Sequence, residues 1–414
     1  MNLGRIVPVP SGLSLDSTLK SISALFHRHE VLRSRFYMDG RGTPFQSVGD
    51  CGELMVEEYE AAGADCRDVA RTVKERISAV PFTAPEFPLR VALVTEQRRA
   101  AMLVLCAFHM ATDAWGMKVI VDDLVSVMHA FRDGRGDPPS SPPTQVLERL
   151  EYEQSPQGVR RSEKSLDYWE KQLHLFPEHA VPAATHQPAS AVFRELHMDS
   201  TALSAACGTL AHKGKVNVGA VFVGLVAELL CAMNENSGAG FLLFGHNRYG
   251  GKWARFSGPL VQNFPLQVTV AGKTFLEVAR DIDQQSFKGS FFSQYDPAGL
   301  IDVISNAAEH LGFTPDLSLA MNTKLVRDSG SPTPETDTLP DTEPQDPEHL
   351  TAGSRISEGA GIHREDMNLY LSIDSKPDCA KILMRANTRI FSIGQMKNFL
   401  QDLEACALRN RMRP

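Results

Sequence analysis

The sequence feature that most constrains the fold is an almost entirely apolar run over residues 99–110, which ends at His109 and Met110. A strand with apolar side chains on both faces must be covered on both faces, which is typical of a central strand in an α/β sheet. Helical spacing of apolar residues begins at Met117, so we expect Asp113 and Trp115 in the turn between this strand and a helix. The ends of such strands often carry the chemistry of α/β proteins.

The rest of the chain alternates helices and strands. Residues 16–26 form an expected helix with Asp16 as its cap and with Leu19, Ile22, Leu25 and Phe26 on one face. Further helices are expected over 162–173, 216–233 and 393–408, and strands over 87–96, 240–248, 367–374 and 380–391. We therefore predict a mixed α/β (α+β) protein.

A chain of 414 residues is longer than one core usually serves. Pro, Gly and Ser concentrate between residues 134 and 144, and the amphipathic helix at 162–173 ends the first half. We predict two lobes, residues 1–165 and 166–414. Within the second lobe, residues 328–360 are rich in acidic residues, Pro and Ser with few apolar anchors, which predicts a disordered loop.

Composition excludes several classes of protein. A formal charge of −8 argues against a nucleic-acid binder, and no apolar stretch approaches the roughly 18 residues of a membrane span. The N-terminal residues lack a basic and apolar secretory signal, so we expect a cytoplasmic protein. Seven scattered cysteines without a C-x-x-C pair predict reduced, mostly structural thiols.

His109 has two interpretations when it is considered alone. A histidine in an apolar setting is usually a hydrogen-bonded core residue. However, Asp113 follows four residues later across a turn, where it can hold the local backbone or pair with an arginine. An imidazole presented at a strand end by such a turn is suited to proton transfer near neutral pH.

The stretch FHMATDAWGM (residues 108–117) resembles the H-H-x-x-x-D-G signature of the condensation domains of nonribosomal peptide synthetases. These domains belong with the chloramphenicol-acetyltransferase-like acyltransferases. The second histidine and the aspartate of the signature match His109 and Asp113, whereas Phe108 replaces the first histidine and Ala114 replaces the glycine.

Further stretches resemble motifs of the same family in the same order. LFHRHEVLRSRF resembles an early R-H-E-x-L-R-x-x-F element, and GTPFQSV, FPLRVALV and LDYWEKQL resemble three later ones. The stretch from Arg248 to Val268 resembles an arginine followed by G-x-x-V-N-x-x-P-L-R, except that the motif asparagine falls on Gln262, with Asn263 one place later. Each of the six matches is weak, but together they occur in the family's order and span most of the chain. The chain therefore resembles the condensation-domain family as a whole.

The resemblance implies two acetyltransferase-like sandwich subdomains in a V shape, with an active-site tunnel between them. It implies an acyltransferase that moves an acyl or peptidyl group from a carrier-protein thioester to an amine, with His109 as the catalytic base. Asp113 and Arg248 would form a structural ion pair that holds the turn presenting His109. The implied candidates for the substrate channel are Ala114, Trp115, Gly116, Gln262 and Asn263.

The resemblance also implies the partners. Substrates would arrive on the phosphopantetheine arms of donor and acceptor carrier proteins, or the acceptor would be a small amine or alcohol. We expect no cofactor or metal bound by the chain itself, and a monomer that contacts neither nucleic acid nor membrane.

Departures from the family pattern leave other functions open. Phe108, Ala114, Gln262 and a missing family opening segment favour a condensation-like module that has lost catalysis and docks a carrier or a tailoring enzyme. Formation of an ester with a hydroxyl acceptor is a third interpretation, because the walls of the tunnel rather than the motif select the acceptor.

Competing motifs in the same residues are weaker. GHNRYGGK (residues 245–252) has the wrong glycine spacing for a phosphate-binding loop, and Trp253 stands where Ser or Thr should follow. The same stretch resembles an epimerization motif, but Phe244 replaces its glutamate. His27 and His29 have no third ligand at metal-site spacing, so we interpret them as structural.

Overall fold

The structure is a computed structural model that describes residues 2–135, 142–185, 192–323, 354–362, 367–376 and 378–412. The chain divides into two compact units. Unit 1 comprises Met1–Gly158 and Arg248–Val261, and unit 2 comprises Val159–Asn247 and Gln262–Pro414. The sequence places residues 248–261 in the second lobe, whereas the structure groups them with unit 1. We call Arg248–Val261 the return segment.

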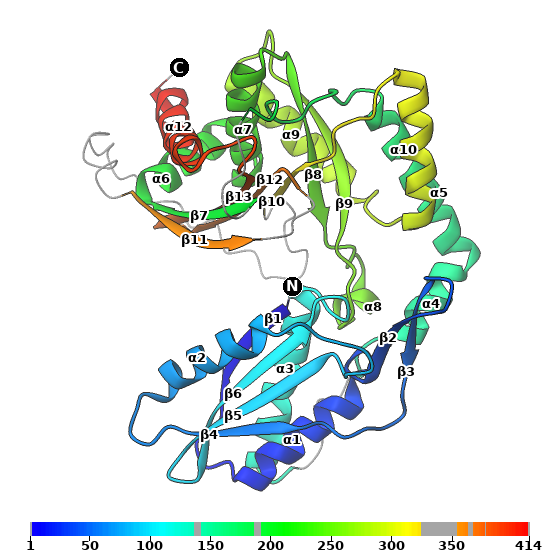
Figure 1. Cartoon of the computed structure of the whole chain (residues 1–414), viewed down its shortest axis with the longest axis vertical. Coiled ribbons are helices and arrows are strands. Elements are labelled where there is room, and N and C mark those ends of the chain that lie inside the picture. The colour runs from blue at the N-terminus through cyan, green and yellow to red at the C-terminus, as the bar shows by residue number, and fades with distance from the viewer. Residues whose placement is uncertain are drawn as a thin grey trace. The chain divides into compact units, whose positions relative to one another are not determined.

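Unit 1 contains a four-stranded sheet in the order β1-β6-β5-β4 (Figure 1). Strand β6 pairs antiparallel with β1 and β5, and β4 pairs parallel with β5. The predicted strand at residues 99–110 is therefore a central strand. The strands are β1 (Asn2–Pro8), β4 (Val56–Glu60), β5 (Leu89–Glu96) and β6 (Arg99–Phe108).

Both faces of β6 are buried, as its sequence predicts. Leu103 and Leu105 lie in a core cluster with residues of α1 (Leu15–Arg28) and α3 (Ala114–Arg132). Val104 and Cys106 point to the other face, in a cluster with residues of α2 (Cys66–Ala79). Helices on both faces thus hold the strand that leads to His109.

Helix α1 begins earlier than predicted. Its N-cap is Ser14, whose side chain accepts a hydrogen bond from the Ser17 N–H, and Asp16 lies in the first turn. Leu19 is 41% exposed because the buried stripe runs through Ile22, Leu25 and Phe26. Unit 1 also contains η1 (Glu30–Arg33), β2 (Ser34–Met38), β3 (Pro44–Val48), α4 (Val146–Gln154) and α8 (Gly251–Ala254).

Unit 2 contains a seven-stranded sheet in the order β11-β7-β13-β12-β10-β8-β9 (Figure 1). Strand β10 pairs parallel with β12 and β8, and the other pairs are antiparallel. The strands are β7 (Phe193–Ser200), β8 (Gly238–Gly245), β9 (Gln262–Thr269), β10 (Leu319–Thr323), β11 (Arg355–Ile362), β12 (Leu369–Lys376) and β13 (Cys379–Asn387).

Helices cover both faces of this sheet. The largest core cluster lies against α6 (Thr201–Gly214), α7 (Val218–Asn234), α9 (Phe275–Ser290) and α12 (Ile393–Met412). A smaller cluster includes Trp169 and Leu173 of α5 (Pro156–Leu173) and Ala307 of α10 (Pro297–Leu311). Strand β8 contributes alternate side chains to the two clusters, Phe241 and Leu243 to the larger and Leu242 to the smaller.

The prediction of a disordered loop over residues 328–360 is wrong for its last residues. Residues 328–353 lie outside the described residues, but Arg355–Ile362 form the edge strand β11, which pairs with β7. An edge strand is held by main-chain hydrogen bonds and needs few apolar side chains, which explains why composition missed it. Glu358 also pairs with Arg194 and Lys397.

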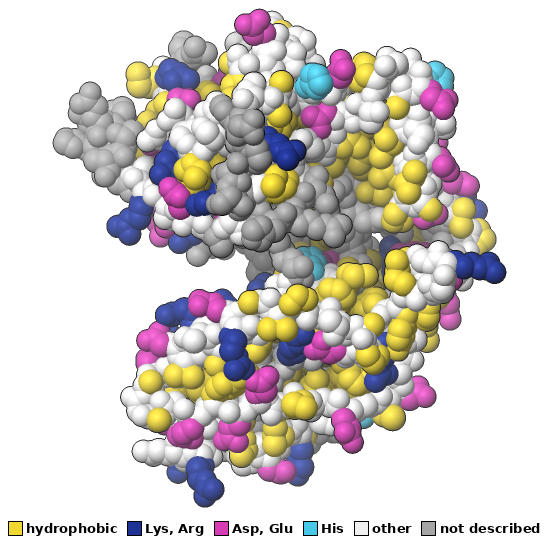
Figure 2. Space-filling model, in the orientation of Figure 1, with side chains coloured by type: hydrophobic (Ala, Val, Ile, Leu, Met, Phe, Trp, Pro, Cys, Tyr) yellow, Lys and Arg dark blue, Asp and Glu magenta, His cyan; other side chains and the backbone are white. Residues whose placement is uncertain are grey.

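The described residues contain no disulfide and no single helix suited to cross a membrane. All seven cysteines are unpaired. No single helix within the described ranges has the length and apolarity of a membrane span, although α6 and α7, bent by 106°, pass that test as a pair by length and composition. On the visible face of each unit, acidic and basic side chains are interspersed (Figure 2).

Candidate active site

The predicted catalytic turn lies between β6 and α3. Strand β6 ends at Phe108, His109 follows in a turn, and α3 begins at Ala114 with Asp113 as its N-cap. Trp115, expected in the turn, lies instead in the first turn of α3. The helix begins this early because the Asp113 carboxylate accepts a hydrogen bond from the Gly116 N–H at 2.8 Å, which caps it.

The Asp113 carboxylate holds both ends of the return segment. The guanidinium of Arg248, its first residue, donates to Oδ1 at 2.8 Å and to Oδ2 at 2.9 Å. The backbone N–H groups of Leu260 and Val261, its last residues, donate to Oδ2 at 2.8 and 3.1 Å. With the Gly116 N–H this buried carboxylate accepts five hydrogen bonds, so the pairing of Asp113 with Arg248 is part of a larger junction.

Arg248 is as fully enclosed as its partner, with no exposed side-chain surface. Burial lowers the pKa of Arg248, and the adjacent Asp113 carboxylate raises it again. Arginine keeps its charge in proteins, so the guanidinium is a buried cation. The guanidinium also donates to the carbonyl of Gly258 at 2.7 Å, which folds the segment around it.

Other contacts attach the middle of the return segment to unit 1. Trp115 Nε1 donates to the carbonyl of Ala254 at 3.1 Å, and Thr112 Oγ1 donates to the carbonyl of Ser257 at 2.6 Å. Side chains of α4 and its flank add the following contacts: Thr144 Oγ1 to the Lys252 carbonyl at 2.6 Å, Glu148 to Lys252 Nζ at 3.1 Å, and the Arg149 guanidinium over the Trp253 ring at 4.8 Å. The segment is thus bound along its whole length.

A second buried carboxylate, which the sequence analysis missed, holds the same segment. Asp123 of α3 contacts Arg28 Nε at 2.8 Å, His29 Nε2 at 3.2 Å and Arg255 Nη2 at 2.6 Å. Burial opposes its ionisation, but hydrogen bonds from His29 and Arg28 hold the pKa of Asp123 well below its usual range. An aspartate among the apolar residues of a helix, between Ile120 and Leu124, was the available signal.

His29 lies between Asp123 and the return segment. Its Nδ1 is 3.0 Å from Ser257 Oγ, and the ring is fully buried. Burial lowers the pKa of His29, although the Asp123 carboxylate acts in the opposite direction. His27, in contrast, is exposed and bonded to the carbonyl of Ser23 in its own helix. The two histidines therefore lie in different environments, and only His29 is enclosed.

His109 is exposed on unit 1, unlike the buried residues around Asp113. Within the described ranges no group is hydrogen-bonded to its ring. Phe108, which replaces the first histidine of the motif, packs edge-on against Phe36 at 5.8 Å and stacks on Phe82 at 5.4 Å. The strand end is therefore fixed by aromatic packing, while the imidazole remains available to an incoming molecule.

The remaining candidates have different environments. Ala114 is exposed at the first position of α3. Gly116 is buried, and a Cβ on it would lie 2.2 Å from the carbonyl oxygen of Ser257, so its role is close packing. Gln262 and Asn263 begin β9 in unit 2, where Gln262 Nε2 donates to the carbonyl of Tyr295 at 3.0 Å.

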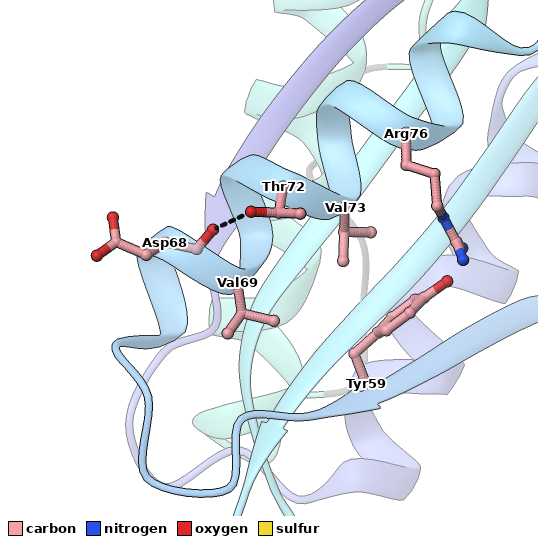
Figure 3. Close-up of a pocket in the computed structure, with 6 residues that line it drawn as sticks. All are labelled: Tyr59, Asp68, Val69, Thr72, Val73 and Arg76. Carbon is pink, nitrogen blue, oxygen red and sulfur yellow. Dashed lines mark hydrogen bonds between the residues drawn. The ribbon is translucent and has the colours of Figure 1, made fainter.

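A pocket of about 480 Å³ on unit 1 does not involve these residues. It lies between α2 and β4, where Val69 and Val73 face Tyr59 and the Arg76 guanidinium lies over the Tyr59 ring at 4.9 Å (Figure 3). A second pocket is lined by polar residues of the unit 2 sheet, including His197 and Lys381. Within the described ranges no group of three or more His, Cys, Asp or Glu side chains could hold a metal ion.

A family model and curated relatives place the chain in the same protein family. The condensation-domain model matches residues 2–407. The chain is 25% identical over 205 residues to a linear gramicidin synthase of Brevibacillus parabrevis, which is 46% of this chain and 4% of that protein. It is 27% identical over 180 residues to the bassianolide nonribosomal cyclodepsipeptide synthetase of Beauveria bassiana, 43% of this chain and 6% of that protein. The chain therefore spans only a small part of these relatives.

Solved structures share the fold. The condensation domain described for chain release from the enacyloxin polyketide synthase matches with a TM-score of 0.73 at 15% identity, covering 100% of this chain and 78% of that one. SgcC5 from Streptomyces globisporus matches at 0.72 and 20% identity, covering 100% and 93%. The X-domain from teicoplanin biosynthesis matches at 0.71 and 16% identity, covering 100% and 91%. The two-lobe acetyltransferase-like fold predicted from the sequence is confirmed, while the V-shaped arrangement of the lobes and the tunnel remain predictions.

Proposed function

This chain belongs to the condensation-domain family of nonribosomal peptide synthesis, and we propose that it transfers an acyl or peptidyl group from a carrier-protein thioester to an amine. The observation that carries the proposal is the environment of His109. The ring is exposed in the turn after a central strand, four residues before a buried carboxylate that already has five hydrogen-bond donors. Asp113 is fully engaged, so His109 is the group of this turn that can accept a proton.

The proposed reaction forms one bond and breaks one. The amine nitrogen attacks the thioester carbonyl carbon, and the carbon–sulfur bond breaks when the tetrahedral intermediate collapses. His109 takes the proton that the nitrogen loses and returns it to the departing thiolate. The products are an amide and the free thiol of the carrier arm. General-base assistance of this kind contributes about 10²- to 10⁴-fold in rate.

The substrates follow from the same proposal. The donor acyl group arrives on the phosphopantetheine arm of a carrier protein, and the acceptor amine is a small molecule or is held by a second carrier. The chain itself binds no cofactor in this scheme. Gln262 and Asn263 are proposed to position substrate by their amides, and Ala114 and Trp115 to border the channel, whereas the buried Gly116 packs against Ser257 and is not retained as a channel residue.

A catalytically inactive docking module is the second candidate. Phe108 favours it, because an aromatic cluster replaces the first histidine of the motif. The likeness to the teicoplanin X-domain, which is also known in a complex with OxyB, supports it as well. In this role the chain would bind a carrier or a tailoring enzyme, and the junction of Asp113 with Arg248 would only maintain the fold.

Ester formation with a hydroxyl acceptor is the third candidate. One relative is a cyclodepsipeptide synthetase, and SgcC5 is described in complex with a diol. The proton transfers at His109 would be the same, with oxygen in place of nitrogen as the attacking atom. Acceptors of both kinds therefore belong in one experiment.

The test incubates the protein with carrier proteins loaded with a panel of aminoacyl thioesters and with soluble amines or alcohols. Product is measured by mass spectrometry for wild type, His109→Ala and a matched control, His27→Ala, which changes an exposed histidine away from the turn. The proposal expects product from wild type and the control, and at least about a hundredfold less from His109→Ala. Equal product from all three proteins contradicts a role for His109. No product above background, together with carrier or enzyme binding, supports the docking module.

A further inference from the structure

Three buried side chains connect α3 to the return segment in a line. Asp123 Oδ2 lies 3.2 Å from His29 Nε2, and His29 Nδ1 lies 3.0 Å from Ser257 Oγ. Exposed fractions are 3% for Asp123, 0% for His29 and 2% for Ser257. His29 is the histidine of the R-H-E element, but neither that resemblance nor the proposed reaction gives these three residues a part in catalysis.

Charges around Asp123 determine the proton positions in this line. Arg28 and Arg255 both donate to the Asp123 carboxylate, which holds it ionised and makes it only an acceptor. The ionised Asp123 carboxylate favours a proton on the facing His29 Nε2, 3.2 Å away, although this contact lacks the alignment of a hydrogen bond. Nδ1 is then left to accept from the Ser257 hydroxyl, a tautomer that is assigned from the surrounding charges. His29 is neutral in this arrangement, which agrees with the effect of burial on its pKa.

The line has the connectivity of a serine–histidine–aspartate triad, but its burial excludes that chemistry. A nucleophilic serine must reach a substrate, and the Ser257 side chain is enclosed. Any effect of Asp123, His29 and Ser257 on catalysis must therefore pass through the residues that they contact. Ser257 provides the connection, because it also touches the catalytic turn.

Ser257 contacts both the catalytic turn and the start of α3. Its carbonyl accepts a hydrogen bond of 2.6 Å from Thr112 Oγ1, and Thr112 stands three residues after His109. The same carbonyl leaves no room for a Cβ on Gly116, so the two backbones are in direct contact. A shift of Ser257 would therefore be transmitted to the turn that carries His109.

We infer that His29 and Ser257 are positioning residues for His109. His29 fixes the Ser257 side chain against α3, Ser257 fixes Thr112, and the backbone from His109 to Asp113 takes its orientation from that contact. The inference rests on the proposed acyl transfer for its catalytic effect. A small misplacement of a catalytic group lowers the turnover rate while ground-state binding is retained, so kcat rather than KM should respond.

Paired substitutions separate positioning from simple stability. His29→Asn keeps an acceptor near the Nδ1 position facing Ser257, whereas His29→Gln keeps a donor near the Nε2 position facing Asp123. Thr112→Ser keeps the hydroxyl that bonds to Ser257, and Thr112→Val removes it with little change in shape. We expect the two variants that keep the link to Ser257 to retain kcat within about threefold, and the other two to lose about tenfold with KM nearly unchanged.

The ring Cε1–H resonance of His109 gives a second measurement that needs no turnover. His29→Gln and Thr112→Val should shift this resonance, while His29→Asn and Thr112→Ser should leave it at the wild-type position. Urea unfolding of each variant shows whether it is folded under the conditions of the assay.

Outcomes for the two proposals can be told apart. If wild type forms product but kcat is the same in all four variants, or follows their unfolding free energies, the positioning role is wrong and the proposed function stands. If wild type forms no product, the proposed function fails, and the His109 resonance still decides the positioning role. An unshifted resonance in His29→Gln and Thr112→Val overturns it.

Discussion

Asp113 and Arg248 form a two-point ion pair in which neither side chain is more than 2% exposed. The pair joins the N-cap of α3 to the first residue of the return segment. The same carboxylate oxygen that binds Arg248 Nη1 also accepts the N–H groups of Leu260 and Val261, so one side chain closes a loop of backbone onto unit 1.

Replacing this carboxylate should be costly. Asp113→Asn leaves the Arg248 guanidinium buried without its counter-charge, and we expect the free energy of unfolding to fall by about 3–5 kcal/mol. Urea unfolding measures this. Asp122→Asn is the matched control on the same helix, because Asp122 makes only an exposed pair with Lys118 and should change stability by less than about 1 kcal/mol. Similar losses in both variants would contradict the special role of Asp113.

Loss of Asp113 should also expose the return segment to proteolysis. Lys252 and Arg255 within the segment are potential trypsin sites, and a bound segment is cut slowly. We expect faster cleavage after these residues in Asp113→Asn than in wild type or Asp122→Asn, as measured by mass spectrometry of timed digests. Equal cleavage rates would show that contacts other than Asp113 hold the segment.

Gly116 should not tolerate a methyl group. In Gly116→Ala the new Cβ would lie 2.2 Å from the Ser257 carbonyl oxygen, so the backbones must move apart, at a cost of about 1–3 kcal/mol. The control is Gly251→Ala, where a Cβ meets nothing within 4 Å and φ is not in the left-handed region. Thermal unfolding should show a lower melting temperature for the first variant alone.

Stability should depend on pH through His29. Burial lowers the pKa of His29 below the ordinary value of 6.5, so the unfolded chain takes up a proton more readily than the folded one. The contribution of the neutral ring is present above pH 6.5 and is lost as the pH falls from there through the folded-state pKa. Asp123, Arg28, Arg255 and the Ser257 hydroxyl are the groups facing the ring.

The corresponding measurement is the free energy of unfolding between pH 7 and pH 5. We expect it to decrease with acidification in wild type and in His27→Gln, which changes an exposed histidine, and to decrease less steeply in His29→Gln. If the three slopes coincide, His29 does not contribute to the acid sensitivity.

Local patterns in the sequence predicted the parts of the fold that depend on apolar periodicity. Strand β6 has apolar side chains on both faces, and its central position follows from that pattern. The start of α1 was misplaced because Ser14 and Asp16 are both acceptable caps, and the choice depends on where the buried stripe of the helix faces. Strand β11 was missed because backbone pairing, not side-chain pattern, forms it.

For the candidate site, the sequence indicated one buried ion pair and did not reveal the other. Motif resemblance named His109, Asp113 and Arg248 as candidates. The structure brings Asp113 and Arg248 into contact, and the role of His109 stays a prediction. The resemblance did not reveal Asp123, whose three partners come from α1, from the residue before η1 and from the return segment. The position of Asp123 among apolar helix residues marks it as unusual, but its partners meet only when distant segments come together, so no local spacing in the sequence predicts them.

The membership of the return segment in unit 1 has a practical consequence for building chimeric proteins. Cutting the chain once, near residue 158, and exchanging everything beyond it would separate Arg248 and Arg255 from Asp113 and Asp123. In such a hybrid the buried carboxylates come from one parent protein and their arginine partners come from the other. Recombination that transfers residues 248–261 together with residues 1–158 keeps each carboxylate with its own cations, and should give the better folded hybrids.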